Sequence, residues 1–206
     1  MGLSINVKRA YLAKLEKKKE NGVPTYKYGT PEHIPGLETV NIVPTVATGE
    51  KRGDGKPRVK VVKVVGNTLT VDVNKLPQEW RQYLEGKTFK NGVEGDDGDC
   101  TPKPFAFGFI NEYTDDDNKV YEEMQWFIDC LMEPIEENLK QAEEKSVDIT
   151  SDSMKITAFK VEQFNDRSYV KIDTQNTDVT EDMINNFFKQ VQTGYEITAP
   201  SETTGN

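Results

Sequence analysis

Two clusters of acidic side chains are the first candidates for a chemical site in this sequence. Three aspartates stand in a row at 115–117, and Asp96, Asp97 and Asp99 lie in the run GDDGD. Carboxylates gathered in this way can bind Ca²⁺, but a helix–loop–helix calcium site needs ligands at alternate positions, a glycine and a terminal glutamate. Neither run has that pattern, so we interpret both as solvated turns and expect no metal site.

The sequence has few residues for histidine-based or cysteine-based catalysis, with one histidine and two cysteines. His33, the single histidine, lies in a proline-flanked segment, where a loop residue without a special role is the ordinary expectation. Cys100 and Cys130 have no CxxC partner, which favours reduced thiols over a disulfide or a zinc site. Glu122 and Glu123 are adjacent, so on a strand they point to opposite faces and cannot share a substrate. We therefore expect no catalytic activity and no cofactor.

The basic, glycine-rich segment 49–60 (GEKRGDGKPRVK) has some features of a phosphate-binding loop. However, Gly49 and Gly55 are one residue too far apart, and Pro57 stands where a serine or threonine must bind Mg²⁺. The adhesive tripeptide Arg-Gly-Asp at 52–54 is explained by chance in a loop so rich in these residue types. We interpret the segment as a loop that orders against an acidic neighbour.

Charge divides the chain into a basic first third and an acidic remainder. Lysine and arginine outnumber aspartate and glutamate over residues 1–63, although the whole chain of 206 residues has a net charge of −9. This asymmetry suggests a basic arm for an anionic partner, or complementary patches on copies of the same protein. With 35% hydrophobic residues and a mean hydropathy of −0.70, part of the chain is expected to order only against neighbours. No apolar run approaches a membrane span, so we expect a soluble protein made in a cytoplasm.

A β-hairpin at the centre of the fold is predicted by the segment 103–134. Phenylalanines alternate with smaller residues over 105–110, turn residues follow at 114–119, and apolar side chains recur at spacing two on the returning strand. Large side chains such as Trp126 and Phe127 fall on both faces of that strand. It is therefore predicted to be central and covered from both sides.

Two further hairpins are predicted where turn residues separate apolar runs. One turns at Gly66-Asn67, which leaves one face apolar and the other polar. The other turns at Asn165-Asp166. The predicted pairs are Val64 with Leu69, Val62 with Val71 and Lys63 with Thr70 in the first, and Val161 with Val170 and Phe159 with Ile172 in the second. The predicted core contains Val62, Val64, Leu69, Val71, Phe107, Trp126 and Ile128.

Two short helices flank the strands. The segment 77–84 (PQEWRQYL) has proline at its start and Gly86 at its end. Thr180 caps a second helix that runs to Val191, with two acidic residues at the positive end of its dipole. The predicted buried side chains are Leu76, Trp80 and Leu84 in the first helix, and Ile184, Phe187, Phe188 and Val191 in the second.

Other segments are less sharply determined. Residues 7–15 are interpreted as a first strand, although their helix formers leave a helix open. Three prolines favour an extended segment or edge strand over 25–46, and 87–102 is a long acidic loop. The segment 133–146 is either helix or extended. Together the elements predict a mainly β protein with flanking α, a two-sheet β-sandwich with long loops or arms. We expect one domain over residues 1–197 and a disordered tail over 198–206.

The order of these elements resembles the major tail (tail tube) proteins of bacteriophages with long, non-contractile tails. The resemblance rests on the basic loop, the valine-rich segment after it, the helix PQEWRQYLEG and the strands KPFAFGFINE and VYEEMQWFIDCLMEP. It spans residues 7–192 and is closest over 76–158. The motifs are hydrophobic patterns, and the loop 87–102 and the segment 133–146 depart from the family.

The resemblance implies a structural, non-enzymatic virion protein. Its subunits would form hexameric rings that stack into a tube, and the tube would carry DNA without binding it tightly. The partners implied are further copies of the chain and the tape measure, tail terminator and tip proteins, with no membrane and no cofactor. The location implied is the virion tail, after assembly in the host cytoplasm.

Two sets of residues are candidates for these contacts. The loop 48–59 is expected to reach the neighbouring ring, and a polar strand face is expected to line the lumen, where an acidic chain repels phosphates. The inter-ring candidates are Lys51, Arg52, Asp54, Lys56 and Arg58, and the lumen candidates are Lys63, Thr70 and Asp72.

Two alternatives belong to other functional classes. A monomeric β-sandwich binding or adhesion module would need a pocket or an aromatic patch, which the sequence does not single out. A nucleic-acid-binding assembly protein would use the basic first third as an arm, but only Tyr11, Tyr26 and Tyr28 are interleaved with its cations.

Overall fold

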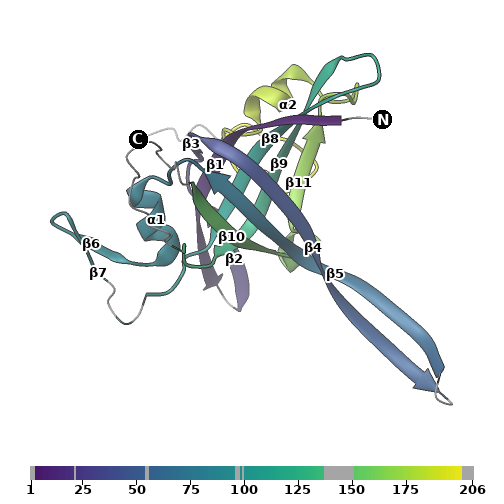
Figure 1. Cartoon of the computed structure of the whole chain (residues 1–206), viewed down its shortest axis with the longest axis horizontal. Helices are drawn as coiled ribbons and strands as arrows, with labels where there is room; N and C mark the ends of the chain where they lie inside the picture. Colours follow the sequence, from purple (N-terminus) through teal and green to yellow (C-terminus); the bar gives the residue numbers. More distant parts are fainter. Residues whose placement is uncertain are drawn as a thin grey trace, which may run out of the picture.

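The structure is a computed structural model, and it describes residues 3–20, 22–53, 56–95, 98, 100–136 and 151–200, without the side chains of 50–53 and 56–60. Within these residues the chain forms a nine-stranded antiparallel sheet, a two-stranded sheet and two short α-helices (Figure 1). The predicted class, mainly β with flanking helix in a β-sandwich, is confirmed.

The elements follow one another without a repeat. The strands are β1 (Leu3–Glu20), β2 (Val23–Tyr28), β3 (Glu32–Ile34), β4 (Leu37–Gly53), β5 (Lys56–Val73), β6 (Thr88–Lys90), β7 (Val93–Gly95), β8 (Phe105–Thr114), β9 (Val120–Met132), β10 (Asp152–Phe159) and β11 (Tyr169–Asp173); the helices are α1 (Gln78–Glu85) and α2 (Glu181–Asn186). The large sheet has the order β2-β1-β8-β9-β10-β5-β4, with β3 beside β1 and β11 beside β9. Strands β6 and β7 form the small sheet.

Strand β9 holds the centre of the sheet, as predicted for the hairpin β8–β9. One edge of β9 pairs with β8. The other edge is shared: its residues 130–132 pair with β10, and its residues 123–127 pair with β11. Residues 7–15 lie within β1, which pairs with β8, so the strand alternative for this segment is the right one.

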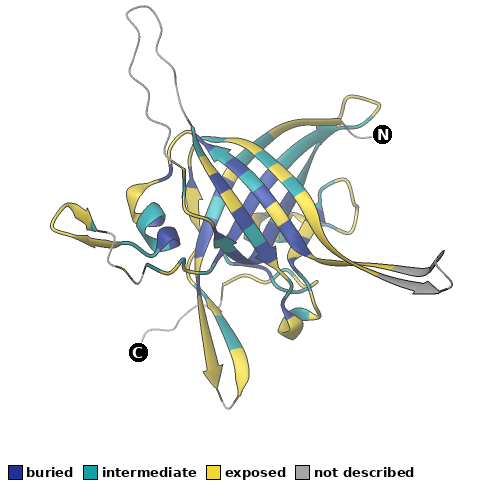
Figure 2. Ribbon diagram, turned by 60° about the horizontal axis from the view of Figure 1, so that its bottom comes forward, coloured by how far each residue is buried: buried dark blue, intermediate teal, exposed yellow. Residues whose placement is uncertain are grey.

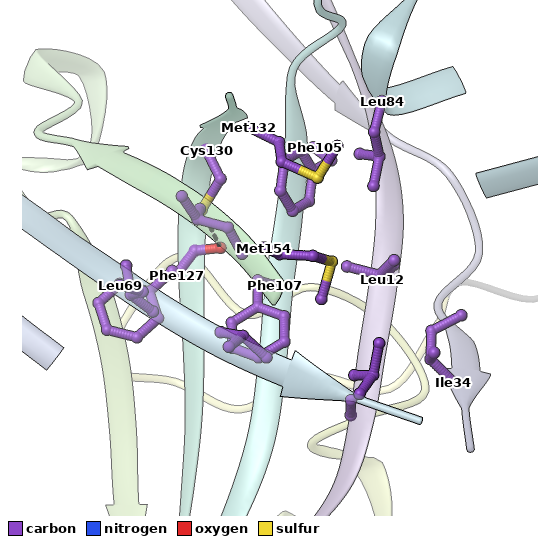
Figure 3. Close-up of a cluster of buried hydrophobic side chains, with 14 of the residues drawn as sticks. Leu12, Ile34, Leu69, Leu84, Phe105, Phe107, Phe127, Cys130, Met132 and Met154 are labelled. Atoms are coloured by element: carbon purple, nitrogen blue, oxygen red, sulfur yellow. Dashed lines mark hydrogen bonds between the residues drawn. The ribbon is translucent and has the colours of Figure 1, made fainter. Parts of the chain in front are cut away.

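The main core lies inside the bent sheet (Figure 3). Leu12 of β1, Phe107 of β8 and Leu69 of β5 belong to one buried cluster, although β1 and β5 are far apart in the strand order. Along the strands, buried positions alternate with more exposed ones (Figure 2), as the two-residue period of a strand requires. Trp80 and Leu84 of α1 join the same cluster.

A second buried cluster lies on the opposite side of β8 and β9, under the C-terminal segment that contains α2. Trp126 is fully buried there, and its Nε1 donates a hydrogen bond to the Phe187 carbonyl at 2.9 Å. Gly108 on β8 makes room for the indole, because a Cβ at this position would lie 2.7 Å from the Trp126 ring. Strand β9 is thus covered on both faces, as the sequence predicted.

The predicted turn at Gly66-Asn67 is wrong. Both residues lie inside β5, which pairs with β4 on one edge and β10 on the other, and neither has the positive φ that a two-residue hairpin turn requires. Gly66 is needed for a close approach, since a Cβ would lie 2.6 Å from the Ala158 carbonyl oxygen. The buried Asn67 side chain donates to the Ser168 hydroxyl at 2.9 Å. The pairs predicted across this turn therefore do not form.

The last predicted hairpin is also wrong. Strands β10 and β11 do not pair with each other, because each has a longer partner in β5 or β9. Asn165 and Asp166 do adopt a turn with positive φ, and Val161 forms an isolated bridge with Arg167 beside it. The turn carries the chain from one part of the sheet to another.

Both predicted helices are present. Helix α1 ends at Gly86 in the left-handed conformation, as expected for a C-terminal glycine. Thr180 caps α2 by accepting a hydrogen bond from the Met183 N–H, but the helix ends at Asn186 rather than at Val191. In the loop 87–102, strands β6 and β7 pair with each other, and most of the segment 133–146 lies outside the described residues.

Glu85, the last residue of α1, links the helix to Lys87 and to the segment at Ile135. Its buried carboxylate lies 2.7 Å from Lys87 Nζ and 3.6 Å from Arg81 Nε, and accepts the Ile135 N–H at 3.0 Å. Burial alone raises the pKa of Glu85, but the hydrogen bonds from Lys87 and Ile135 and the nearby cations lower it overall. Because this pKa is depressed on folding, its contribution to stability is present at neutral pH and lost in acid.

Glu85→Gln is therefore expected to lower the urea midpoint at neutral pH. The difference from the parent protein should shrink at about pH 3.5, where an ordinary glutamate is mostly protonated. Glu196→Gln, at an exposed position of the C-terminal segment, is the control and should leave the midpoint unchanged at both pH values. An equal deficit of Glu85→Gln at both pH values would exclude this role of the carboxylate charge.

Candidate functional site

The outer face of β4, β5 and β10 carries short polar side chains, and no described element covers it. Thr39 donates a hydrogen bond to the Asp72 carboxylate at 2.5 Å, and the hydroxyls of Thr45 and Thr68 lie 3.1 Å apart. These strands are favoured because threonine has a high β propensity and because the residues between the polar ones, such as Leu69 and Val71, are buried in the core. The face comprises Thr39, Asn41, Val43 and Thr45 on β4, Thr68, Thr70 and Asp72 on β5, and Ser153, Lys155 and Thr157 on β10.

The predicted lumen residues fall in two places. Thr70 and Asp72 lie on the polar sheet face, as their alternation with buried Leu69 and Val71 suggested. Lys63 pairs with Ala47, beyond a register shift at the end of this face. The threonine and serine rows of β4 and β10 were not predicted, because the turn wrongly placed at Gly66-Asn67 assigned the partners of β5 to residues within β5 itself.

The charge of this face differs from the sequence expectation. Asp72 and Lys155 are the charged residues of this face, and their opposite charges cancel. Most of the acidic residues of the chain lie elsewhere. A DNA-facing surface was expected to be acidic. Weak affinity for phosphates would instead follow from the shortage of cations on a hydroxyl-rich surface.

Residues 46–53 of β4 and 56–64 of β5 form a two-stranded arm that projects from the sheet (Figure 1). The predicted loop 48–59 is thus mostly strand, since β4 reaches Gly53 and β5 begins at Lys56. At the root of the arm, good strand formers face each other, since Val46 pairs with Val64 and Thr48 with Val62. Of the inter-ring candidates, Lys51, Arg52, Lys56 and Arg58 lie in these strands with side chains outside the described part, and Asp54 lies wholly outside it.

The root of the arm exposes valines. Val46, Val62 and Val64 are 50%, 57% and 42% exposed, so the prediction that Val62 and Val64 belong to the core is wrong. They lie beyond the register shift at Thr45/Val46, where the arm leaves the sheet and its own core ends. Two-stranded ribbons are marginal by themselves in water, which favours a partner for this surface.

A pocket of about 630 Å³ opens at the root of the arm. Val64, Pro44 and Asn67 of β4 and β5 form one side, and Tyr169 of β11 and the segment around Gly194 contribute others. The pocket is lined by Lys160, Arg167 and Lys171 against a single acidic residue, Asp166, in a chain that is acidic as a whole. Sequence reasoning missed this pocket because its residues come from separate segments.

The charged side chains elsewhere in the sheet form ion pairs between neighbouring strands. Lys8 Nζ lies 2.5 Å from Glu112 and 2.7 Å from Glu122, and Lys17 Nζ lies 2.7 Å from the buried Asp129. The hydrogen bond from Lys8 is the largest cause that lowers the pKa of Glu112. These contacts tie β1 to β8 and β9.

The acidic turn at 115–117 also has a structural explanation. The Asp115 carboxylate accepts the N–H groups of Asp117 and Lys119 at 3.0 and 2.9 Å, which closes the β8–β9 turn. No group of three or more His, Cys, Asp or Glu side chains in the described ranges is arranged to hold a metal ion. Asp96, Asp97 and Asp99 lie outside those ranges.

Comparisons with protein families and with curated proteins give no match for this chain. In the described part of the chain, neither helix has the length and apolar character needed to cross a membrane. The function is therefore inferred from the geometry of the sheet face, the arm and the pocket.

Proposed function

We propose that the chain is a tail tube protein, a structural subunit that assembles into stacked hexameric rings around a channel for DNA. The observation that carries the proposal is the polar, uncovered face of β4, β5 and β10 on a sheet whose other face is core. A sheet face made of hydroxyls suits a water-filled channel wall. Copies of this face around an axis would surround the channel.

The arm supports the same proposal. It exposes Val46, Val62 and Val64 to solvent, and its outer part has the sequence EKRGDGKPRVK in an otherwise acidic chain. A projection with exposed valines and basic residues is better stabilised by packing on a neighbouring subunit than by full exposure to solvent in a monomer. Tape measure, terminator and tip proteins are the further partners of a tube, and the virion tail is its location.

Electron microscopy of the purified protein is the direct test. We expect rings or tubes with a central channel at high protein concentration. Images that contain only separate globular particles under all concentrations and salts would contradict the proposal and favour a monomeric binding module.

The position of the sheet face in the tube can be tested by thiol labelling. In a Cys100→Ser background, Thr68→Cys places a thiol on the polar face, and Cys130 is fully buried. A maleimide on a large polymer should label Thr68→Cys in single subunits but not in tubes, because the polymer is too wide for the channel. Thr177→Cys, an exposed position beside α2, is the matched control and should react in both states. Equal labelling of Thr68→Cys in tubes would remove this face from the channel.

A further inference from the structure

We propose that a second pocket is a binding site for a neutral carbohydrate. It lies between strand β2, the 3₁₀ turn η1 (Glu162–Phe164) and the C-terminal segment, and its volume of about 640 Å³ is a usual size for a small-ligand site. It adjoins the pocket at the root of the arm, with which it shares Arg167, Gly194 and Tyr195. We call it the aromatic pocket, because four aromatic residues line it: Tyr26, Tyr28, Phe164 and Tyr195. The proposal does not rest on the assembly of the chain.

A sugar ring has two kinds of surface. One face is covered by C–H groups, and the rim carries hydroxyls that each donate and accept hydrogen bonds. The C–H face is attracted to the negative face of an aromatic ring. Side-chain amides match the hydroxyls, because an amide also both donates and accepts. A carbohydrate site therefore combines exposed aromatic faces with amide side chains.

Tyr195 presents such an aromatic face. Its side chain is 87% exposed, whereas tyrosine rings are usually buried at least in part. The Arg167 guanidinium lies over the ring, 3.8 Å from its centroid. Since this contact covers one face and the residue is still so exposed, the opposite face is open to solvent. Packing within the described chain does not explain an exposed ring that is held in this way.

The segment that carries Tyr195 is fixed by the buried side chain of Gln192. The Gln192 amide donates to the Thr198 carbonyl at 3.1 Å and accepts the Thr198 N–H at 3.2 Å, which closes the loop between the two residues. Arg167 donates to the Thr193 carbonyl at 3.1 Å and so ties the same loop to the start of β11. The ring of Tyr195 is therefore positioned before a ligand arrives, which favours binding.

Tyr26 and Phe164 supply further aromatic surface. Their ring centroids lie 5.5 Å apart at an angle of 56°, and both residues are half-buried. The neighbouring Tyr28 is fixed by a hydrogen bond from its hydroxyl to the Ile128 carbonyl at 2.9 Å. The Tyr26 hydroxyl has no hydrogen-bond partner among the described residues, so it is available to a ligand.

Two amide side chains at the pocket are also available. Gln163 and Asn165 are exposed, and within the described ranges neither side chain makes a hydrogen bond. Asn165 has a left-handed backbone at the end of η1, and its N–H donates to the Glu162 carbonyl at 3.0 Å. The two amides are thus placed beside the rings, where they can bond to the hydroxyls of a stacked sugar.

The charge of the pocket favours a neutral ligand. Among the described lining residues, Arg167 is the one cation and Glu196 the one carboxylate, so their charges cancel. A nucleic acid would need several cations for its phosphates. A proline-rich peptide also packs on aromatic rings, but proline has no N–H and would leave the acceptor side of the amides unused.

Saturation-transfer difference NMR tests the proposal, since it detects weak ligands of single subunits and of assemblies. The probes are maltotetraose, cellotetraose, laminaritetraose and N-acetylchitotetraose. We expect at least one to bind at millimolar concentration or below. Tyr195→Ala should weaken this binding about tenfold, because the stacking face is lost. Tyr195→Phe should bind as the parent protein does, and Gln163→Ala should bind about fivefold more weakly.

The control variant is Phe89→Ala, which removes a 43% exposed ring from β6, outside the pocket. It should bind the sugar as the parent protein does. The urea midpoint of Tyr195→Ala should stay near that of the parent protein, because the ring is exposed. A weaker affinity of Tyr195→Ala then reports the pocket rather than a loss of folding.

Three results would overturn the proposal. The first is that none of the four sugars binds. The second is an equal affinity of Tyr195→Ala and the parent protein, which would place the sugar elsewhere on the chain. The third is that a proline-rich peptide or a single-stranded oligonucleotide binds in a Tyr195-dependent way and the sugars do not. Each result is independent of whether the chain forms tubes.

Discussion

Replacement of Trp126 with alanine is expected to destabilise the protein by about 3 to 5 kcal/mol. The indole is fully buried between β9 and the C-terminal segment, where it contacts Phe188 at a ring distance of 5.4 Å. Its removal leaves a cavity and leaves the Phe187 carbonyl without its 2.9 Å hydrogen bond. The loss is a large part of the stability of a typical domain.

Urea denaturation, followed by circular dichroism, measures this effect. Val120→Ala is the control on the same strand, since the Val120 side chain is 53% exposed and should contribute only tenths of a kcal/mol. Trp126→Phe should fall between the two, because it keeps an aromatic ring but removes the N–H donor. An unchanged midpoint for Trp126→Ala would show that the second buried cluster does not hold the C-terminal segment.

Shortening of the arm is expected to abolish tube formation and to leave a folded subunit. The register pairs Thr48 with Val62, so residues 49–61 can be replaced by Asn-Gly, which forms a two-residue hairpin turn. Thr48 and Val62, the residues that the new turn would join, are exposed, and the urea midpoint should therefore stay near that of the parent protein. Electron microscopy and light scattering at equal concentration and salt measure the loss of tubes.

A charge-reversal variant separates the roles of charge and shape in the arm. Lys51, Arg52 and Lys56 changed to Glu keep the length of the arm but invert its charge. Exposed ion pairs contribute about 0 to 1 kcal/mol each, but contacts repeated around a ring and along a tube add up. We expect this variant to form only short assemblies at low salt and to recover part of its assembly at high salt, which screens the repulsion. Tubes as long as those of the parent protein, in both variants, would exclude the arm as an assembly contact.

The elements predicted well from sequence are those whose signals are local. The hairpin β8–β9 carries its alternation, its turn and its two-sided burial within one stretch of chain, and α1 has proline and Gly86 at its ends. These patterns reflect physical requirements that neighbouring residues meet together. The outer sheet face was found in part for the same reason, since Thr70 and Asp72 alternate with buried residues of β5.

The errors arose where distant partners override a local signal. Gly66-Asn67 has the composition of a turn, but the close approach of Ala158 and the hydrogen bond to Ser168 use the glycine and the asparagine in a continuous strand. The glycine-rich arm has the composition of a loop, yet its two halves pair almost to the tip. The pocket combines segments near Pro44, Arg167 and Tyr195, and no single stretch of sequence carries a sign of it.

The pairing of β1 with β8 has a consequence for how the chain is made. Leu12 finds its partner Phe107 only after the intervening strands have left the ribosome, whereas β4 and β5 are neighbours in sequence and can pair early. Non-local pairing slows folding and prolongs the exposure of strand edges. A nascent chain stalled before β8 would therefore present β1 paired with β2 and β3 but with its β8 edge open, together with a finished, valine-bearing arm. We expect this stage of biosynthesis to be the one most prone to aggregation, and quick completion of β8 and β9 would shorten it.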